Sequence, residues 1–155
     1  MSNTKFNKAF EKANKTKKRY RVLMGGAGSG KSVNTAQDFI TKLSNPQYKG
    51  CSLLVVRATE TSHLNSTFSE LQGAIMRLNL EKKLWIINKS PLQMQNVVTG
   101  NYIYFRGCND FRAIDHLKSV TVPQGKLCWI GIEEATEIKS SDFEIIDDRL
   151  RGKLK

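Results

Sequence analysis

Residues 25–32 read Gly25-Gly26-Ala27-Gly28-Ser29-Gly30-Lys31-Ser32, which matches the phosphate-loop pattern G-x-x-x-x-G-K-S/T at every fixed position. The glycines let the backbone adopt positive φ angles, so that successive N–H groups can point at one phosphate. Lys31 supplies a mobile positive charge for the β- and γ-phosphate oxygens, and Ser32 supplies a hydroxyl for Mg²⁺. We therefore predict that all eight residues bind a nucleotide.

The segments on either side of the loop have the patterns of a strand and a helix. Arg21–Met24 is predicted to be a short strand that leads into the loop. Apolar residues after the loop recur at spacings of three or four, which predicts an amphipathic helix: Val33, Ala36, Phe39, Ile40 and Leu43. The loop would thus open a helix N-terminus, where the dipole favours anions. A dinucleotide fingerprint is excluded, because G-x-G-x-x-G read from Gly26 needs glycine where Lys31 stands.

Strand and helix patterns alternate along the rest of the chain. Strands are predicted at 52–57, 92–94, 102–105 and 127–132, with a hairpin turn at Gly100-Asn101 and the last strand central in the sheet. Helices are predicted at 65–79, near 110–117 and from Ser141 onward, the first and last beginning with the capping-box patterns Thr67–Glu70 and Ser141–Glu144. This alternation indicates an α/β fold with a mainly parallel sheet.

Length and composition indicate one globular domain. The chain has 155 residues, no apolar run near the roughly 20 residues of a membrane span, and a polar, lysine-rich beginning unlike a signal peptide. Cys51, Cys108 and Cys128 are odd in number and far apart, which argues against a disulfide framework or zinc site and favours the cytoplasm. His63 and His116 are isolated and receive no role, and Trp85 and Trp129 are interpreted as core or strand residues.

A formal net charge of +11 favours a polyanionic partner. Much of the charge lies in and just after a basic N-terminal arm, residues 1–19, where Glu11 alone opposes Lys5, Lys8, Lys12, Lys15, Lys17, Lys18, Arg19 and Arg21. The arm is either a solvated basic segment or a nucleic-acid contact, and charge alone does not decide between them. A second basic group ends the chain: Arg149, Arg151, Lys153 and Lys155.

Glu133 and Glu134 follow the predicted 127–132 strand and supply the acids that a phosphate loop needs. The carboxyl ends of neighbouring parallel strands line one crevice, so Glu133 can face the loop. We expect Glu133 to hold Mg²⁺ together with Ser32, and Glu134 to orient or deprotonate the attacking water. A small-molecule kinase does not need this second acid, and a GTPase would show Asn-Lys-x-Asp, which is absent. ATP is therefore the expected nucleotide, and hydrolysis is the expected reaction.

Several segments together resemble the ATPase domain of tailed-phage terminase large subunits, over about residues 20–152. The similarity lies in Gly25–Ser32, Leu54–Arg57, Ser66–Phe68, Ile103–Gly107, Ile130–Ala135 and Arg149–Gly152. The resemblance implies a P-loop NTPase fold of the ASCE, RecA-like type, a three-layer sandwich that is truncated here because the coupling strand and nuclease domain of the family do not follow. Residues 20–155 would then be an incomplete P-loop ATPase domain.

The resemblance also implies roles for particular residues. Lys31 and Ser32 match the Walker A positions, Glu133 the Walker B metal acid, and Glu134 the catalytic glutamate. Arg57 matches an arginine after the second strand and is either a sensor or arginine finger, or a strand-end arginine that packs on its neighbour. Arg149 and Arg151 are read as cations at a helix C-terminus, or as groups acting in trans or on DNA. Ala27 stands where family members often have a basic residue.

The family powers the translocation of double-stranded DNA into a procapsid. Implied partners are duplex DNA, a portal protein, the small terminase subunit and further copies in a ring, in the host cell cytoplasm and away from membranes. Two other functions remain open: a fragment that binds nucleotide or DNA without turnover, and another ATP-driven nucleic-acid motor of helicase type.

Overall fold

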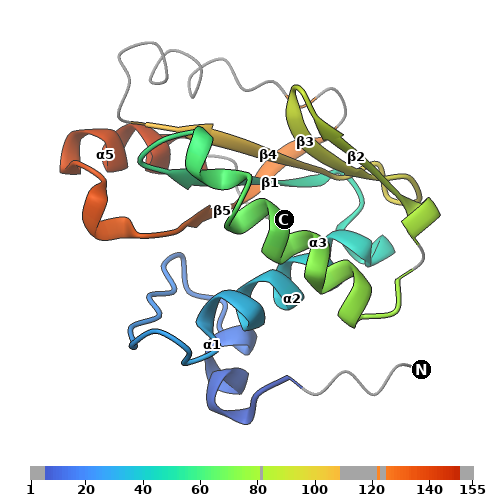
Figure 1. Cartoon of the computed structure of the whole chain (residues 1–155), viewed down its shortest axis with the longest axis horizontal. Coiled ribbons are helices and arrows are strands. Elements are labelled where there is room, and N and C mark those ends of the chain that lie inside the picture. The colour runs from blue at the N-terminus through green and yellow to red at the C-terminus, as the bar shows by residue number, and fades with distance from the viewer. Residues whose placement is uncertain (1–5, 81, 109–121, 123–124, 151–155) are drawn as a thin grey trace.

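The computed structural model describes residues 6–80, 82–108, 122 and 125–150. Five strands and four α-helices are defined in this part of the chain, with short 3-10 turns between them (Figure 1). The strands are β1 Cys51–Arg57, β2 Trp85–Lys89, β3 Leu92–Asn96, β4 Tyr102–Gly107 and β5 Lys126–Ile132. The α-helices are α1 Glu11–Lys15, α2 Lys31–Ser44, α3 Thr67–Arg77 and α5 Ser140–Asp148. The 3-10 turns are η1 Lys8–Phe10, η2 Pro46–Tyr48, η3 Thr61–His63, η4 Lys82–Leu84 and η5 Ala135–Glu137.

The strands form one mixed sheet in the order β2-β3-β4-β1-β5. β1 is parallel to β4 and to β5, whereas β3 is antiparallel to β2 and to β4. The expectation of a mainly parallel sheet is therefore wrong for the β2-β3-β4 half. The connections explain why, because only Ser90-Pro91 separates β2 from β3, and residues 97–101 separate β3 from β4. A parallel crossover needs about a dozen residues or more, so these strands can only turn back on themselves.

Helices cover both faces of the sheet, as an α/β fold requires. Leu53, Val55 and Phe105 pack with α2 and α3 in one core, which Figure 1 shows as two helices side by side on one side of the sheet. Leu54 and Val56 point to the other face and pack with Ile146 of α5. This double coverage buries residues 52–56 of β1 in an unbroken run, confirming the predicted buried strand.

The helices predicted at 65–79 and from Ser141 onward are present, but their starts differ from the predicted capping boxes. α3 lies within the predicted 65–79 range, and the last helix begins at Ser140. Neither N-cap residue forms a side-chain capping hydrogen bond. The Thr67 hydroxyl instead lies 2.7 Å from His63 Nδ1, and Glu70 pairs with Arg77. Partners four and seven residues away along the chain have thus replaced the predicted capping bonds of α3. The predicted helix near 110–117 and His116 lie outside the described residues.

The predicted strand before the phosphate loop is not formed. Arg21–Met24 has no strand assignment, and Val22 and Met24 are 79% and 90% exposed. The segment is positioned by a side chain, because Arg21 forms an ion pair with Asp38 of α2 at 2.7 Å. β5 likewise ends the described sheet and is not central. Its flanking position explains why most of its residues are only half-buried, against the fully buried run of β1.

The two cysteines of β1 and β5 form a disulfide, which corrects the expectation from cysteine spacing. Cys51 and Cys128 are 77 positions apart in sequence, yet their Cα atoms lie 5.2 Å apart. The register between the strands shifts after Ser52–Leu127, and Leu53 pairs with Trp129, so Cys128 is the extra residue of a bulge. Parallel pairing of β1 and β5 therefore brings these two cysteines together although they are far apart in the sequence. Cys108 is buried and is not part of a disulfide.

Both tryptophans are core or strand residues as predicted: Trp85 is 5% exposed, and Trp129 lies edge-on to Tyr48 with ring centroids 5.3 Å apart. Among the described residues, no helix combines the length and apolarity that a membrane crossing requires.

Candidate functional site

The phosphate loop curls immediately before α2. Gly28 and Gly30 have φ angles of 73° and 80°, a conformation that side chains with a Cβ rarely adopt. Gly30 is the N-cap of α2 and provides no side-chain acceptor for the first-turn N–H groups. These donors and the positive end of the helix dipole therefore remain available to an anion.

Lys31 is folded back over its own loop. Its ammonium donates to the Gly26 carbonyl and to Ser29 Oγ, both at 3.0 Å, and also to the Gly25 carbonyl. The positive charge is therefore placed over the concave side of the loop, within reach of a phosphate that enters it. Residues 25–29 are exposed, Ala27 included, so the loop is open to solvent.

The end of β5 brings a carboxylate to the loop. The backbone N–H of Glu133 donates to the Val56 carbonyl at 3.1 Å, which continues the pairing with β1. At this point Ser32 Oγ donates to Glu133 Oε1 at 3.4 Å, across 101 positions of sequence. The two predicted metal-binding residues therefore lie side by side, one at the start of α2 and one after β5.

The other oxygen of Glu133 has an unusual environment. Oε2 is buried and has no hydrogen-bond partner. Arg57 Nε lies 3.7 Å from it and is also buried without a hydrogen-bond partner. Burial raises the pKa of Glu133, which the Arg57 charge and the Ser32 hydrogen bond oppose, while Glu134 and Glu70 raise it further. A buried carboxylate oxygen without a hydrogen-bond partner is costly, so the environment of Glu133 favours a nearby cation.

A hydroxyl and a carboxylate are suitable ligands for Mg²⁺, which is usually held by one or two carboxylates, substrate phosphates and waters. No cluster of three or more acidic, histidine or cysteine ligands exists in the described ranges 6–80, 82–108, 122 and 125–150. Ser32 and Glu133 therefore fit a magnesium ion that arrives with a nucleotide, rather than a site built from protein ligands alone.

Glu134 has a strained backbone next to this acid. Its φ and ψ angles are 55° and 52°, in the left-handed region, and its side chain is exposed. A non-glycine residue held there costs about 1–3 kcal/mol, and such strain gathers at functional positions. The turn ends the extended backbone of β5, so that Glu133 and Glu134 do not continue the alternating side-chain directions of a strand.

Arg57 ends β1 and is held within its own chain. Its Nη1 group donates to Ser66 Oγ at 2.7 Å and to the Ser62 carbonyl at 3.2 Å, and its side chain is 15% exposed. Arg57 thus packs at a strand end, which is one of the two alternatives expected for it, and it also lies 3.7 Å from Glu133 Oε2; a role as sensor or arginine finger stays a prediction. Sequence reasoning assigned no role to Ser62, although serines spaced four residues apart before a helix are able to form such a turn.

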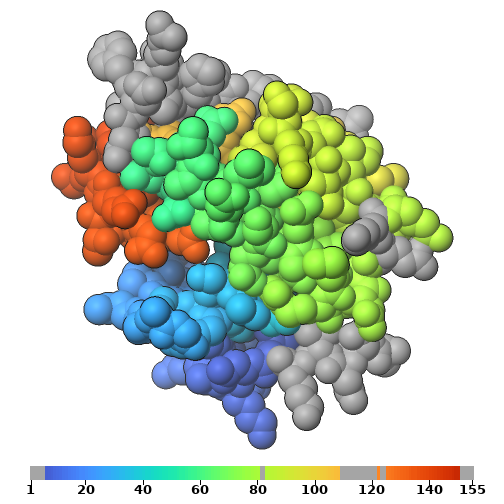
Figure 2. All heavy atoms as spheres, in the orientation of Figure 1, coloured from blue at the N-terminus to red at the C-terminus, as the bar shows by residue number. Residues whose placement is uncertain are grey.

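The described part of the basic arm packs on α2 and α5 rather than standing free. Asn14 and Asn34 exchange side-chain hydrogen bonds of 2.9 and 3.0 Å. Arg19 pairs with Asp147 of α5 at 2.9 Å. Figure 2 shows the blue N-terminal segment lying directly against the residues of α2. The lysines of this segment, Lys8, Lys12, Lys15, Lys17 and Lys18, are exposed.

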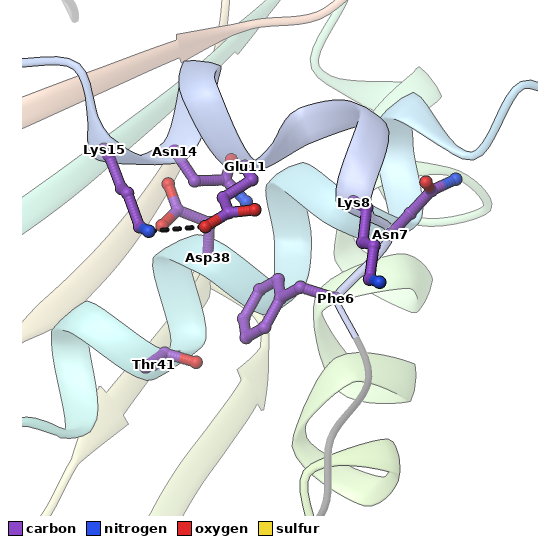
Figure 3. Close-up of a pocket in the computed structure, with 8 residues that line it drawn as sticks. All are labelled: Phe6, Asn7, Lys8, Glu11, Asn14, Lys15, Asp38 and Thr41. Carbon is purple, nitrogen blue, oxygen red and sulfur yellow. Dashed lines mark hydrogen bonds and ion pairs between the residues drawn. The ribbon is translucent and has the colours of Figure 1, made fainter.

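A pocket of about 350 Å³ lies between this arm and α2, away from the loop and the acids (Figure 3). Phe6 and Thr41 line it, and the ion pair between Lys15 and Glu11 crosses one side. None of the predicted site residues is among those that line it.

Comparison with known proteins places these features in a family. Two solved structures of the large terminase from a thermophilic bacteriophage, crystal forms 2 and 3, share the fold with TM-scores of 0.65 each. They are 12% and 10% identical in sequence, and the match covers 83% and 96% of this chain and 30% and 36% of theirs.

The profile of the phage terminase large subunit matches residues 17–155, and the chain belongs to this family. The large terminase subunit of Bacillus phage SPP1 is 34% identical over 121 residues, which covers 78% of this chain and 27% of that protein. The PBSX phage terminase large subunit of Bacillus subtilis (strain 168) is 33% identical over 132 residues, covering 85% and 28%. The chain thus spans little more than a quarter of these relatives, and the family resemblance inferred from the motifs is confirmed.

Proposed function

We propose that this chain binds and hydrolyses ATP with Mg²⁺, as the motor part of a phage DNA-packaging machine. The contact of Ser32 with Glu133 beside the Lys31 loop carries the proposal, because it joins a phosphate-binding loop to a metal-binding acid. Family membership supports the packaging role.

Each side chain has a defined part in this reaction. The backbone N–H groups of residues 25–32 cradle the phosphates, and Lys31 moves from its loop carbonyls to the β- and γ-phosphate oxygens. Ser32 and Glu133 would hold Mg²⁺, which would supply positive charge to the phosphate oxygens. Glu134 orients the attacking water and accepts its proton. Arg57 stands behind Glu133 and acts within its own subunit.

The partners follow from the charge and the family. Double-stranded DNA is the polyanion that the exposed lysines of the arm contact. The portal protein, the small terminase subunit and further copies in a ring are the expected protein partners, in the host cell cytoplasm.

Steady-state ATP hydrolysis of the Glu134→Gln and Lys31→Ala variants tests this assignment. Loss of a catalytic base costs about 10²–10⁴ in rate, so Glu134→Gln should retain nucleotide binding and lose hydrolysis, whereas Lys31→Ala should weaken binding as well. A wild-type rate that Glu134→Gln leaves unchanged would contradict the role of Glu134.

Calorimetric titration that finds binding without any turnover would assign the chain to nucleotide binding alone. Stimulation by single-stranded rather than duplex DNA would indicate a helicase-like motor.

A further inference from the structure

The two carboxylate oxygens of Glu133 face different groups: one faces the proposed Mg²⁺ position and the other faces Arg57. Oε1 faces Ser32, where Mg²⁺ is proposed, and Oε2 faces Arg57 Nε across 3.7 Å. An arginine beside a carboxylate usually closes to about 2.7–2.9 Å and forms charge-assisted hydrogen bonds. Here both atoms are buried and neither has a hydrogen-bond partner. Arg57 and Glu133 therefore form a long ion pair without the hydrogen bond that usually accompanies it.

Two serines account for this distance. Arg57 Nη1 donates to Ser66 Oγ at 2.7 Å, and Ser66 Oγ donates in turn to the Ser62 carbonyl at 2.6 Å. Ser62 O also accepts from Arg57 directly, at 3.2 Å. A hydroxyl has one proton and can accept a hydrogen bond while it donates one. The Ser66 hydroxyl therefore uses both its acceptor and its donor capacity in these bonds. The outer end of the guanidinium is thus held on the side of the serines.

The segment that carries the serines is itself fixed to the sheet. His63 is fully buried, and its ring nitrogens lie 2.7 Å from Thr67 Oγ1 and 2.9 Å from the Arg106 carbonyl of β4. A Cβ added to Gly107 would lie 2.5 Å from Glu60 N, which shows how closely this segment lies on the end of β4. The serines cannot follow Arg57 if it is drawn toward Glu133.

We propose that Ser66, together with the Ser62 carbonyl, prevents Arg57 from forming a close, hydrogen-bonded ion pair with Glu133, and so keeps the negative charge of this carboxylate available to Mg²⁺ at Oε1. Ser66 is a positioning residue in this scheme, because it touches neither metal nor nucleotide and acts through Arg57. The inference rests on the proposed function, since it concerns the magnesium site assigned there. Without Ser66, Arg57 closes on Glu133 and competes with Mg²⁺ for one carboxylate.

The Ser66→Ala variant tests this scheme through the magnesium requirement of nucleotide binding. A non-hydrolysable ATP analogue is titrated into the protein by calorimetry, at a series of Mg²⁺ concentrations and in EDTA. We expect the half-saturating Mg²⁺ concentration to rise three- to tenfold in Ser66→Ala, with no change in the affinity measured in EDTA. Ser66→Thr, which keeps the hydroxyl, should restore the wild-type requirement.

Ser69→Ala is the matched control, because Ser69 lies on the same helix and donates a similar bond, to the Leu64 carbonyl at 2.8 Å, without touching Arg57. It should leave the magnesium requirement unchanged. A double-mutant cycle completes the test: in an Arg57→Gln background, Ser66→Ala should have no further effect on the magnesium requirement, because the competing charge is gone.

The outcomes separate this inference from the proposed function. If the wild type binds the analogue with a clear Mg²⁺ requirement and Ser66→Ala shifts it no more than Ser69→Ala does, the positioning role is overturned and the proposed function stands. An equal shift in the presence and absence of Arg57 also overturns it. If the wild type binds no nucleotide under any condition, both the proposed function and the inference fail.

Discussion

At the scale of single residues, His63 shows how the fold constrains a titratable group. Its ring is fully buried, packs edge-on against Phe105 with centroids 5.5 Å apart, and is bonded through both nitrogens. Burial lowers its pKa below the ordinary value of 6.5, the charges of Arg57 and Arg106 lower it further, and the hydrogen bond to the Arg106 carbonyl opposes the shift. His63 is therefore neutral in the folded protein at neutral pH.

The stability of the fold should consequently fall in mild acid. The unfolded chain binds the His63 proton more readily than the folded protein does, so the contribution of His63 is complete above pH 6.5 and decreases as the pH falls toward its folded pKa. The loss reaches at most about 1.4 kcal/mol for each pH unit below 6.5. Urea unfolding at pH 7.5 and 5.5 measures it, and His63→Gln should show a smaller pH dependence. An equal dependence in both proteins would contradict the assignment.

Gly107 should tolerate no side chain, for a reason of space. An added Cβ would meet the Glu60 nitrogen at 2.5 Å and the Thr59 carbonyl carbon at 2.9 Å, and both are backbone atoms. We expect Gly107→Ala to lower the free energy of unfolding by about 1–3 kcal/mol. Gly73→Ala is the control, since its Cβ meets only the flexible end of Arg77 and alanine favours a helix by about 1 kcal/mol. Comparable unfolding midpoints for the two variants would refute this explanation.

The sequence predicted which residues have the chemistry of a nucleotide site better than it predicted which residues contact one another. The phosphate loop and Glu133 were identified from the types and order of their residues, and the structure brings Ser32 and Glu133 together. Nucleotide binding by the loop, metal binding by Ser32 and Glu133, and the roles of Lys31, Glu134 and Arg57 in catalysis remain predictions. The serine contacts of Arg57 could not be predicted, because they depend on how the segment after β1 lies on β4, which no local pattern encodes.

At the scale of elements, the disulfide joins the strand that carries Glu133 to its neighbour. Cys51 begins β1 and Cys128 lies in the bulge of β5, so the bond lies toward the strand ends opposite Glu133. It closes a loop of 77 residues, and in the chain-entropy description such a crosslink stabilises the folded state by about 4 kcal/mol.

Reduction should therefore lower the stability of the wild type. We expect dithiothreitol to decrease the free energy of unfolding by roughly 2–4 kcal/mol, measured by guanidinium titration. The Cys128→Ser variant should unfold at a lower denaturant concentration without reductant and show no further decrease with it. A variant that still responds to reductant would show that the effect arises elsewhere.

Element types were predicted well where burial decides them, and poorly where pairing decides them. The apolar run of β1 and the helical spacing of apolar residues in α2 indicate which residues are buried, and both elements were predicted. Arg21–Met24 has the apolar residues of a strand, but a strand needs a hydrogen-bonding neighbour, and none of the five described strands pairs with this segment. The capping box at Thr67–Glu70 failed because its two side chains bond to other partners, His63 and Arg77.

At the scale of the whole molecule, the exposed lysines of the arm predict salt-dependent binding to duplex DNA. Each phosphate contact contributes about 0.9 to the slope of log affinity against log salt. Lys12→Gln with Lys17→Gln should therefore flatten the slope by nearly two, as measured by fluorescence anisotropy. Lys49→Gln with Lys89→Gln removes the same charge from exposed positions outside the arm and is the control. Equal slopes for the two pairs would argue against a specific role of the arm.

The contacts between the arm and α5 have a further consequence. Arg19 and Tyr20 precede the phosphate loop, Phe143 and Asp147 follow the acids, and the two segments meet through an ion pair of 2.9 Å and rings 6.3 Å apart. The pair is partly exposed, so it adds at most about 1 kcal/mol by itself. We expect it to act instead as a short tether that raises the effective concentration of Glu133 at Ser32. We expect the two halves of the proposed site, distant in sequence, to stay within reach of each other in the absence of nucleotide.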